Sequence, residues 1–373
     1  MSGLRIRELI RKEFIQLFRD KKNRPLLIIA PLVQLIVFGY VVTTDVRDIR
    51  VGLIDESRTP ESRRLIDAID GNKTFRITNY LVHPADLDRL LLKRAIDLGV
   101  HIPPDFSTQI RKRQTAEIQI LADGSMSNMA SIRISYTMSL LDSFNSQLIN
   151  ELYAKRLDYG EIDGRLRTWY NPNLDSQYFY VPGIVAFLVM LLSLLFTSMA
   201  IVRERESGTM EQLIVTPLKP MELILGKTIP FILISQAQMV LVIVFAILWF
   251  KIPMVGNAFL LLGATFIFLM STLGIGLFIS TVSKTQQQAM MTNFFFILPF
   301  FMLSGFVFPI DNMPTVVQWF TYLNPLQYFL VIVRGIFLKG TGLAVLWPQF
   351  LGLAILGAIV FPAAVNRFRK RMD

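Results

Sequence analysis

One short stretch of the chain combines residue types that bind phosphate: Gly226-Lys227-Thr228. The triplet resembles the end of the phosphate-binding loop of nucleotide-binding proteins, whose full pattern needs another glycine five positions before Gly226. Met221 occupies that position, and the triplet opens an apolar stretch instead of following a buried strand. We therefore predict no nucleotide site in this chain and assign Lys227 to an anchor at the cytoplasmic membrane surface.

Few other residues are candidates for chemistry. The chain has no cysteine and two histidines, which excludes thiolate sites and unaided multi-histidine metal sites. Asp55, Glu56 and Asp123 follow predicted strands and could form an acidic site, although carboxylates at strand ends more often cap turns. We predict no catalytic residue, no metal site and no cofactor, so the chain is not expected to be an enzyme.

The net charge of +10 is unevenly distributed along the chain. Residues 45–177 contain 18 basic and 19 acidic residues, so the basic excess lies near the two ends, within 1–24 and 367–371. Both segments border apolar stretches, where basic residues hold a segment on the cytoplasmic side and attract anionic lipid. This placement predicts contact with membrane lipid and no nucleic-acid binding.

Long stretches without charge determine the class of protein. An α-helix needs about 17–25 apolar residues to cross a membrane. Six segments qualify as spans: 25–44, 178–202, 228–250, 257–281, 286–308 and 344–366. With the N-terminus inside, cytoplasmic segments carry seventeen basic residues and the short outer segments carry three. The sequence predicts an α-helical integral membrane protein with six transmembrane helices and both termini in the cytoplasm.

Residues 312–333 form a further uncharged run that is long enough to span a membrane. Asn324-Pro325 interrupts it near the middle, and proline breaks a helix there. A seventh span would also move the C-terminal basic residues outside. We therefore predict a pair of short re-entrant or interfacial helices over 309–340 on the outer side.

Two other segments have their own patterns. Within residues 1–24, apolar residues recur on one face of a predicted amphipathic helix that lies on the cytoplasmic leaflet, with a solvated basic arm as the alternative. Residues 45–177 alternate predicted strands (50–54, 75–82, 97–102, 116–121) with helices (61–69, 85–96, 106–113, 128–156). This alternation predicts an α/β extracytoplasmic domain inserted between the first two transmembrane helices.

The cytoplasmic segment 203–227 predicts a short helix held between two spans. Thr209 and Gln212 fit a capping box, and Pro217 and Pro220 close the segment. Exposed apolar residues with a charged rim suit the docking of a partner, while a purely structural connector explains the pattern equally well.

The chain resembles a known family, the ABC-2 type permeases, which are the transmembrane subunits of ATP-binding-cassette exporters. The resemblance covers nearly the whole chain and is strongest over 202–227. Further matching segments are 51–56, 59–63, 102–106, 123–128, 169–172, 181–183 and 323–326. It implies a six-span half-transporter that works as a dimer, with a second copy or a related permease, and a separate ABC ATPase subunit that binds the ATP.

The resemblance also implies roles for particular residues. The segment after the second span would be the coupling helix, and its ATPase contacts would be Glu204, Glu206, Thr209, Met210, Glu211 and Leu213. The helices near 310–338 would gate the outer exit, through Asn324, Pro325 and Tyr328. Members with a large outer domain resemble drug-export permeases of the bacterial cytoplasmic (inner) membrane that pair with a periplasmic adaptor.

The fifth predicted span carries a soft apolar surface for a hydrophobic or amphipathic substrate such as a drug or a lipid-like compound. Its candidate path residues are Phe294, Phe295, Phe301 and Met302, with helix packing or lipid contact as the alternative role. The competing function is a membrane-anchored sensor whose outer domain binds a ligand. A sensor would need one or two spans, so we favour export.

Overall fold

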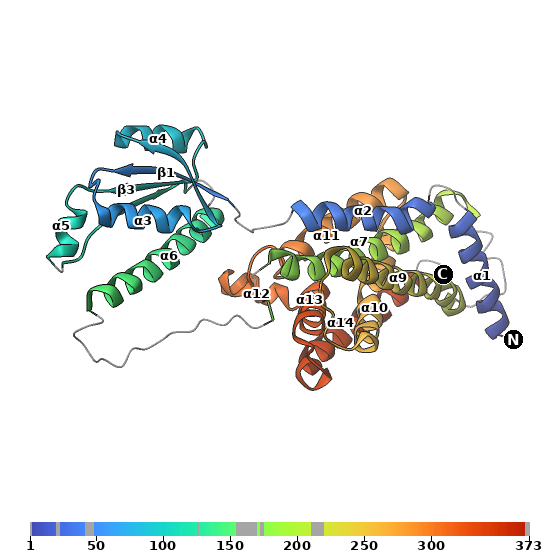
Figure 1. Ribbon diagram of the computed structural model, residues 1–373. Helices are drawn as coiled ribbons and strands as arrows, with labels where there is room; N and C mark the ends of the chain where they lie inside the picture. The colour runs from blue at the N-terminus through green and yellow to red at the C-terminus, as the bar shows by residue number, and fades with distance from the viewer. Residues whose placement is uncertain are drawn as a thin grey trace. The chain divides into compact units, whose positions relative to one another are not determined.

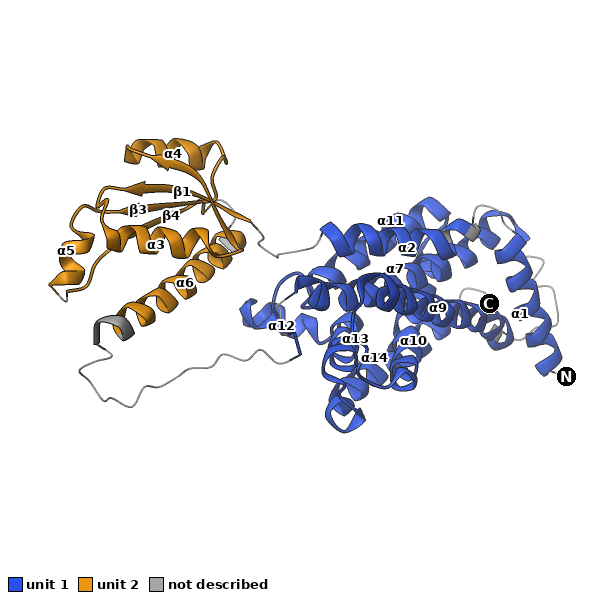
Figure 2. Ribbon diagram, in the orientation of Figure 1, with its two compact units in different colours: residues 1–43, 167–373 blue, residues 44–166 orange. Residues whose placement is uncertain are grey.

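The computed structural model describes most of the chain. The described residues are 2–19, 23–41, 48–112, 114–124, 127–153, 170–171, 175–209 and 220–369. The chain divides into two compact units, one of residues 1–43 with 167–373 and one of residues 44–166 (Figure 2). The residues of the smaller unit thus interrupt those of the larger unit along the chain.

The larger unit is a helical bundle (Figure 1). In chain order its helices are α1 (Ser2–Arg19), α2 (Asn23–Val41), α7 (Ser176–Glu206), α9 (Pro220–Phe250), α10 (Ala258–Val282), α11 (Gln286–Met302), the 3-10 turn η1 (Ile310–Asn312), α12 (Thr315–Thr321), α13 (Pro325–Arg334), the π-helical turn η2 (Gly335–Lys339) and α14 (Leu343–Arg369).

Among the described residues, four helices are long and apolar enough to cross a membrane: α7, α9, α10 and α14. They coincide with four of the predicted spans. The other two predicted spans correspond to α2, whose apolar part is Leu27–Val41, and to α11, which has 17 residues. The helices therefore have the character of a membrane protein with several spans, and the count of six stays a prediction.

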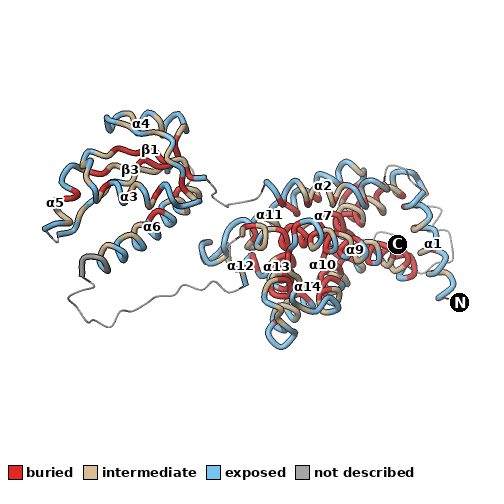
Figure 3. Tube along the Cα trace, viewed as in Figure 1, coloured by how far each residue is buried: buried red, intermediate tan, exposed pale blue. Residues whose placement is uncertain are grey.

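Helix α7 lies in the middle of this bundle, in contact with α2, α9, α10, α11 and α13. Most of its side chains are buried (Figure 3). Two buried hydrogen bonds join it to its neighbours: Ser193 Oγ to Thr272 Oγ1 of α10 at 3.1 Å, and Asn293 Nδ2 of α11 to Ser198 Oγ at 2.6 Å. Polar side chains join transmembrane helices in this way because hydrocarbon offers no competing partner. Displacing α7 must therefore displace α10 and α11.

The helical structure is interrupted at the predicted place, between α12 and α13, which meet at a bend of 80°. Asn324 begins α13, where its side chain accepts a hydrogen bond from Leu326 N at 3.0 Å. Its Nδ2 also donates to Phe300 O of α11 at 2.7 Å. The predicted helix break at Asn324-Pro325 is thus confirmed, and its place on the outer side stays a prediction.

The smaller unit combines a sheet with helices. Its elements are β1 (Ile49–Asp55), α3 (Pro60–Asp70), β2 (Phe75–Leu81), α4 (Pro84–Leu92), β3 (Leu98–Ile102), α5 (Phe106–Arg111), β4 (Gln119–Ala122) and α6 (Ser127–Tyr153). The strand order is β2-β1-β3-β4, with β1 parallel to both neighbours and β4 antiparallel to β3. Each element begins within a few residues of its predicted range.

Helices cover both faces of this sheet (Figure 1). Val51 and Leu53 pack with α3 and α6 on one face, while Ile54 packs with Leu87 of α4 on the other. Glycines in β1 and β3 allow α4 to approach closely, since a Cβ at Gly99 would lie 2.9 Å from Leu87 Cδ2. The central strands β1 and β3 are mostly buried on both faces because helices cover both faces of the sheet.

Two sets of ion pairs stabilise this unit: one joins α6 to the sheet, and the other joins α3 to α5. Asp97 accepts hydrogen bonds from Arg50 Nε at 2.9 Å and pairs with Arg133 Nη2 of α6 at 2.8 Å. Burial raises the pKa of Asp97, but the hydrogen bonds from Arg50 outweigh burial and hold that pKa below its ordinary value. Between α3 and α5, hydrogen bonds from Arg111 and Ser107 lower the pKa of Glu61 to about 2.

We expect Asp97→Ala to destabilise residues 44–166 by about 3 kcal/mol, because it leaves Arg50 and the largely buried Arg133 without their shared carboxylate. Hydrogen exchange of the full chain should show the loss as faster exchange of the β1 and β3 amides. The matched control is Asp86→Ala, which breaks an exposed pair with Arg89 and should change exchange by less than about 1 kcal/mol. Equal effects of the two variants would contradict this assignment.

Candidate functional site

The segment between α7 and α9 holds the residues predicted to contact an ATPase; we call residues 207–219 the connector. Among the six predicted contact residues, the structure describes Glu204, Glu206 and Thr209. The other three, Met210, Glu211 and Leu213, lie outside the described residues. The described part of the site is therefore the base of the connector, where α7 ends and α9 begins.

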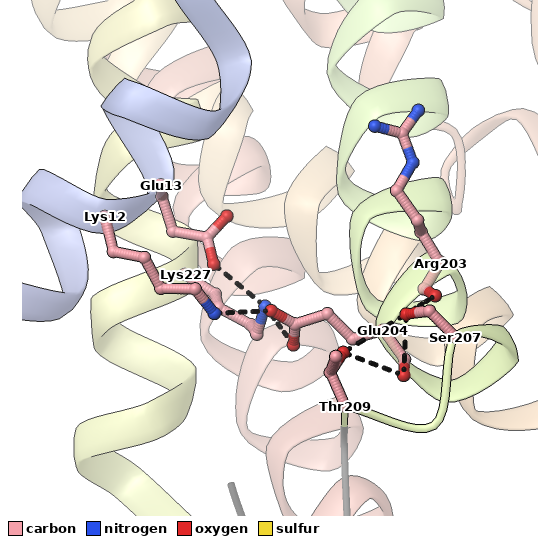
Figure 4. A network of polar contacts seen from close by, with 7 residues as sticks. All are labelled: Lys12, Glu13, Arg203, Glu204, Ser207, Thr209 and Lys227. Carbon is pink, nitrogen blue, oxygen red and sulfur yellow. Dashed lines mark hydrogen bonds and ion pairs between the residues drawn. The ribbon is translucent and has the colours of Figure 1, made fainter. Parts of the chain in front are cut away.

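Four charged residues meet at this base (Figure 4), and we call Lys12, Glu13, Glu204 and Lys227 the charge cluster. Lys227 Nζ of α9 lies 3.0 Å from Glu13 Oε1 of α1 and also pairs with Glu204 Oε2 of α7. Lys12 Nζ lies 3.1 Å from Glu204 Oε1. The cluster thus joins α7 and α9 to α1, which is distant from both in the sequence.

Three of the four side chains in the charge cluster are buried, so the stability of the bundle depends on their being paired. The side chains of Lys227, Glu13 and Glu204 are only 3–5% exposed, whereas Lys12 is 45% exposed. Two lysines balance two carboxylates, so the cluster is neutral as a whole. A buried charge without a partner costs several kcal/mol, so each of the three buried residues depends on the others.

Glycine allows α1 to reach this position. A Cβ at Gly226 would lie 2.7 Å from Leu9 Cβ, so a larger residue there would push α1 away from α9. On α1, Leu9, Glu13 and Leu17 recur every four residues and are all buried, which places Glu13 in the middle of the apolar face. The Gly226-Lys227 pair therefore seats a helix and an ion pair.

The opposite side of α7 is tied to the turn between α10 and α11. Arg205 Nη1 donates to Ser283 O at 2.9 Å and Ser280 O at 3.2 Å, which are carbonyls near the end of α10. Gln286 Nε2, at the start of α11, donates to Glu206 Oε2 at 2.6 Å. The end of α7 is held from both sides by named polar contacts.

Helix α7 ends at a glycine with positive φ. Gly208 adopts φ +73°, a conformation that most side chains avoid, and its N–H donates to Arg205 O at 3.2 Å. Thr209 Oγ1 then donates to Glu204 O at 3.2 Å. The chain leaves α7 in a fixed direction toward the connector.

The predicted contact residues Glu204 and Glu206 differ in exposure. Glu204 is buried and paired with two lysines, so within the described residues it anchors the base of the connector, and its contact with an ATPase stays a prediction. Glu206 is exposed, as a contact residue must be. Lys227 is bound to two carboxylates, which leaves its ammonium without access to a phosphate.

The predicted path residues of α11 divide into two groups. Phe294, Phe295 and Met302 are exposed on the surface of the chain, with Phe295 75% exposed. Phe301 instead packs inside, with its ring centroid 4.4 Å from that of Phe187 on α7. The first three residues are thus open to the surroundings of the chain with Phe301 packed behind them, and their part in a transport path stays a prediction.

The predicted gate residues hold the bend between α12 and α13. Asn324 is buried and caps α13, and Pro325 is the first residue of that helix. Tyr328 donates from its hydroxyl to Tyr322 O at 3.0 Å, and its ring lies close enough to α14 that a Cβ at Gly352 would be 2.5 Å away. These residues fix the geometry of the bend.

Sequence reasoning missed two features. Glu13 was not identified, although a carboxylate flanked by Leu9 and Leu17 at four-residue spacing is the pattern that indicates a buried partner. Arg334, predicted to lie in a short outer segment, ends α13 with its guanidinium 3.7 Å from the ring centroid of Phe179. No local pattern indicates this contact, because Phe179 is distant in sequence.

Comparison with known proteins agrees with this architecture. Residues 25–365 match a family model described as ABC-2 family transporter protein. Two Escherichia coli proteins, named probable multidrug ABC transporter permeases YbhR and YbhS, are 32% and 33% identical, each over at least 99% of both chains. A Dictyostelium discoideum protein named ABC transporter G family member 20 is 22% identical over 94% of this chain, which spans 48% of that protein.

We expect Lys227→Ala to destabilise the helical bundle by about 3 kcal/mol, because Glu13 loses its partner while buried. Thermal unfolding of the purified chain in detergent measures the change. Lys12→Ala removes a half-exposed lysine from the same cluster and should change stability by less than about 1 kcal/mol.

A double variant separates charge from packing. Glu13→Leu with Lys227→Met replaces the buried pair with apolar side chains and leaves Lys12 to neutralise Glu204, so it should recover most of the lost stability. If Lys227→Ala is no more harmful than Lys12→Ala, the cluster does not hold these helices together.

Proposed function

Because this chain belongs to the ABC-2 family of transporter proteins, we propose that it is the permease subunit of a bacterial ABC exporter. It moves a hydrophobic or amphipathic compound outward across the cytoplasmic membrane, and a separate ATPase subunit supplies the energy. Two relatives of the same length are named multidrug ABC transporter permeases, and a third Escherichia coli relative, 26% identical, is named inner membrane transport permease YhhJ.

The observation that carries the proposal is the rigid base of the connector. Buried ion pairs join the end of α7 to α1 and α9, and hydrogen bonds join it to α10 and α11. A force applied to the connector therefore reaches all these helices. An ATPase that draws two connectors together on ATP binding would shift the helices that carry the transport path.

Support for a separate ATPase comes from this chain and its relatives. Met221 stands where a phosphate-binding loop needs glycine, and Lys227 is held by Glu13 and Glu204. The Dictyostelium relative, named an ABC transporter, has as much sequence outside the match as inside it. We infer that the ATP-binding part is a separate partner of this chain, with ATP held by the partner.

The topology follows from the charges. We propose six spans, with α2 and α11 added to the four long helices, both termini in the cytoplasm and residues 45–177 outside. The bend between α12 and α13 then lies on the outer side, where Asn324, Pro325 and Tyr328 shape the exit. A periplasmic adaptor is the expected partner of the outer domain.

The permease acts as a dimer in this proposal, with a second copy or a related permease. The exposed residues Phe294, Phe295 and Met302 of α11 contribute to the path between the two halves. Aromatic and methionine side chains suit such a path because their soft surfaces adapt to apolar compounds of different shapes.

The coupling role predicts that Glu206→Lys or Leu213→Asp will reduce substrate-stimulated ATP hydrolysis by the complex about tenfold or more, as loss of an interface hot spot does. The measurement is ATPase activity of the permease copurified with its ATPase. Glu8→Lys is the matched control, since it reverses an exposed carboxylate on α1 and should leave hydrolysis unchanged. Full assembly and full stimulation in both connector variants would refute the coupling role.

The topology predicts that a cysteine at Asn312 reacts with a membrane-impermeant maleimide added to intact spheroplasts. The natural chain has no cysteine, so the label reports this position alone. Ser207→Cys, at the base of the connector, should react only after the membrane is permeabilised. Labelling of Asn312→Cys only after permeabilisation would place the bend on the cytoplasmic side.

A further inference from the structure

A cleft of about 700 Å³ opens on the surface of the helical bundle between α10, α11 and α14. Ile275 and Phe278 of α10, Phe296 of α11 and Val360 and Ala363 of α14 contribute its apolar lining. Nothing in the proposed coupling mechanism uses this cleft.

Small residues shape the cleft. Helix α14 packs closely on α10 because Gly274 faces the backbone of Phe361, where a Cβ would lie 3.0 Å away. Ala363 and Ala364 then leave room beside α10, and Ala363 is exposed. The result is a largely apolar groove that is open toward the surroundings of the bundle.

Arg367 adds a positive charge to the lining of this groove. Arg367 is exposed, and its guanidinium lies 4.9 Å from the ring centroid of Phe278. Arg369, Lys370 and Arg371 follow it in the sequence. Arginine here combines stacking on an aromatic ring with N–H donors of the kind that bind an anion.

The part of the cleft near Arg367 lies at the end of the bundle where α7 ends and α9 begins. Phe368, next to Arg367, packs with Ile201 of α7 and Leu223 of α9, close in sequence to the charge cluster. With the proposed topology, in which the C-terminus is cytoplasmic, an arginine at this level lies at the boundary between hydrocarbon and headgroups, where a phosphate is within its reach.

We propose that this cleft binds an anionic phospholipid of the adjoining leaflet, with an acyl chain along the apolar lining and its phosphate on Arg367. Water does not fill an apolar groove within the bilayer, so lipid is the available occupant. Basic residues beside a groove between transmembrane helices are a recurring site for anionic headgroups.

A second copy of the chain is a less suitable occupant. The exposed apolar stripe of α11 contains Phe295, Leu298 and Met302, and Phe296 lies about 130° around the helix axis from it. The cleft therefore opens on a different face of α11 from the one offered for a path or a dimer contact. The positive charge at its end also suits a phosphate better than an identical basic segment.

Native mass spectrometry of the delipidated full-length chain tests the proposal, with phosphatidylglycerol and phosphatidylcholine of the same acyl chains. We expect phosphatidylglycerol to bind more tightly, because the choline of phosphatidylcholine offsets the charge of its phosphate. Arg367→Ala should weaken phosphatidylglycerol about fivefold and phosphatidylcholine less. Ala363→Trp fills the groove and should weaken both lipids. Equal affinity for the two lipids, or no effect of either variant, overturns the proposal.

Matched controls isolate the site. Arg63→Ala removes an exposed arginine of α3 in the other unit, and Ala358→Trp enlarges an exposed alanine on another face of α14; both should leave lipid binding unchanged. A single cysteine at Ala363 should not crosslink two copies in membranes, and efficient crosslinking would show that a second copy covers the cleft. These readouts need no ATPase, so they stand or fall separately from the proposed transport function.

Discussion

A lysine buried among helices must have carboxylates within reach, because an isolated buried charge is too costly to keep. Lys227 meets this condition with one carboxylate from α1 and one from α7, each almost fully buried. The three helices cannot separate without exposing or orphaning a charge. The positions of α1, of the end of α7 and of the start of α9 therefore all depend on one ammonium group, and the connector takes its direction from them.

Hydrogen bonds inside the bundle extend this constraint beyond the cluster. Gln286 joins Glu206 to the start of α11, and the Asn293–Ser198 contact joins α11 to α7 again two turns further along. Helix α11 is thus fixed to α7 along one face while its opposite face, with Phe295, is exposed. A displacement that begins at the connector reaches that exposed face as a movement of the whole helix, which is what coupling at a distance requires.

The sequence predicted most helices and strands of both units, but few of the contacts that join one helix to another within a unit. Hydropathy and charge locate helices because each property is local, and the break at Asn324-Pro325 follows from proline chemistry alone. The Glu13–Lys227 pair joins residues 214 positions apart, and no periodicity shows which lysine faces which carboxylate. Glu204 was therefore predicted at a surface. Phe301 was grouped with exposed neighbours because composition does not distinguish adjacent faces of an apolar helix.

Arg334, at the end of α13, is another residue whose contacts come from parts of the chain that are distant in sequence. Arg334 has no local pattern to identify it, yet its guanidinium lies over Phe179 and donates to Gly305 O at 3.4 Å. An aromatic face stabilises a cation without adding a second charge. At the connector, by contrast, cations are neutralised by carboxylates from other helices. Aromatic support joins α13 to the start of α7, and ion pairs join α1 and α9 to its end, so α7 is held at both ends by cations of its neighbours.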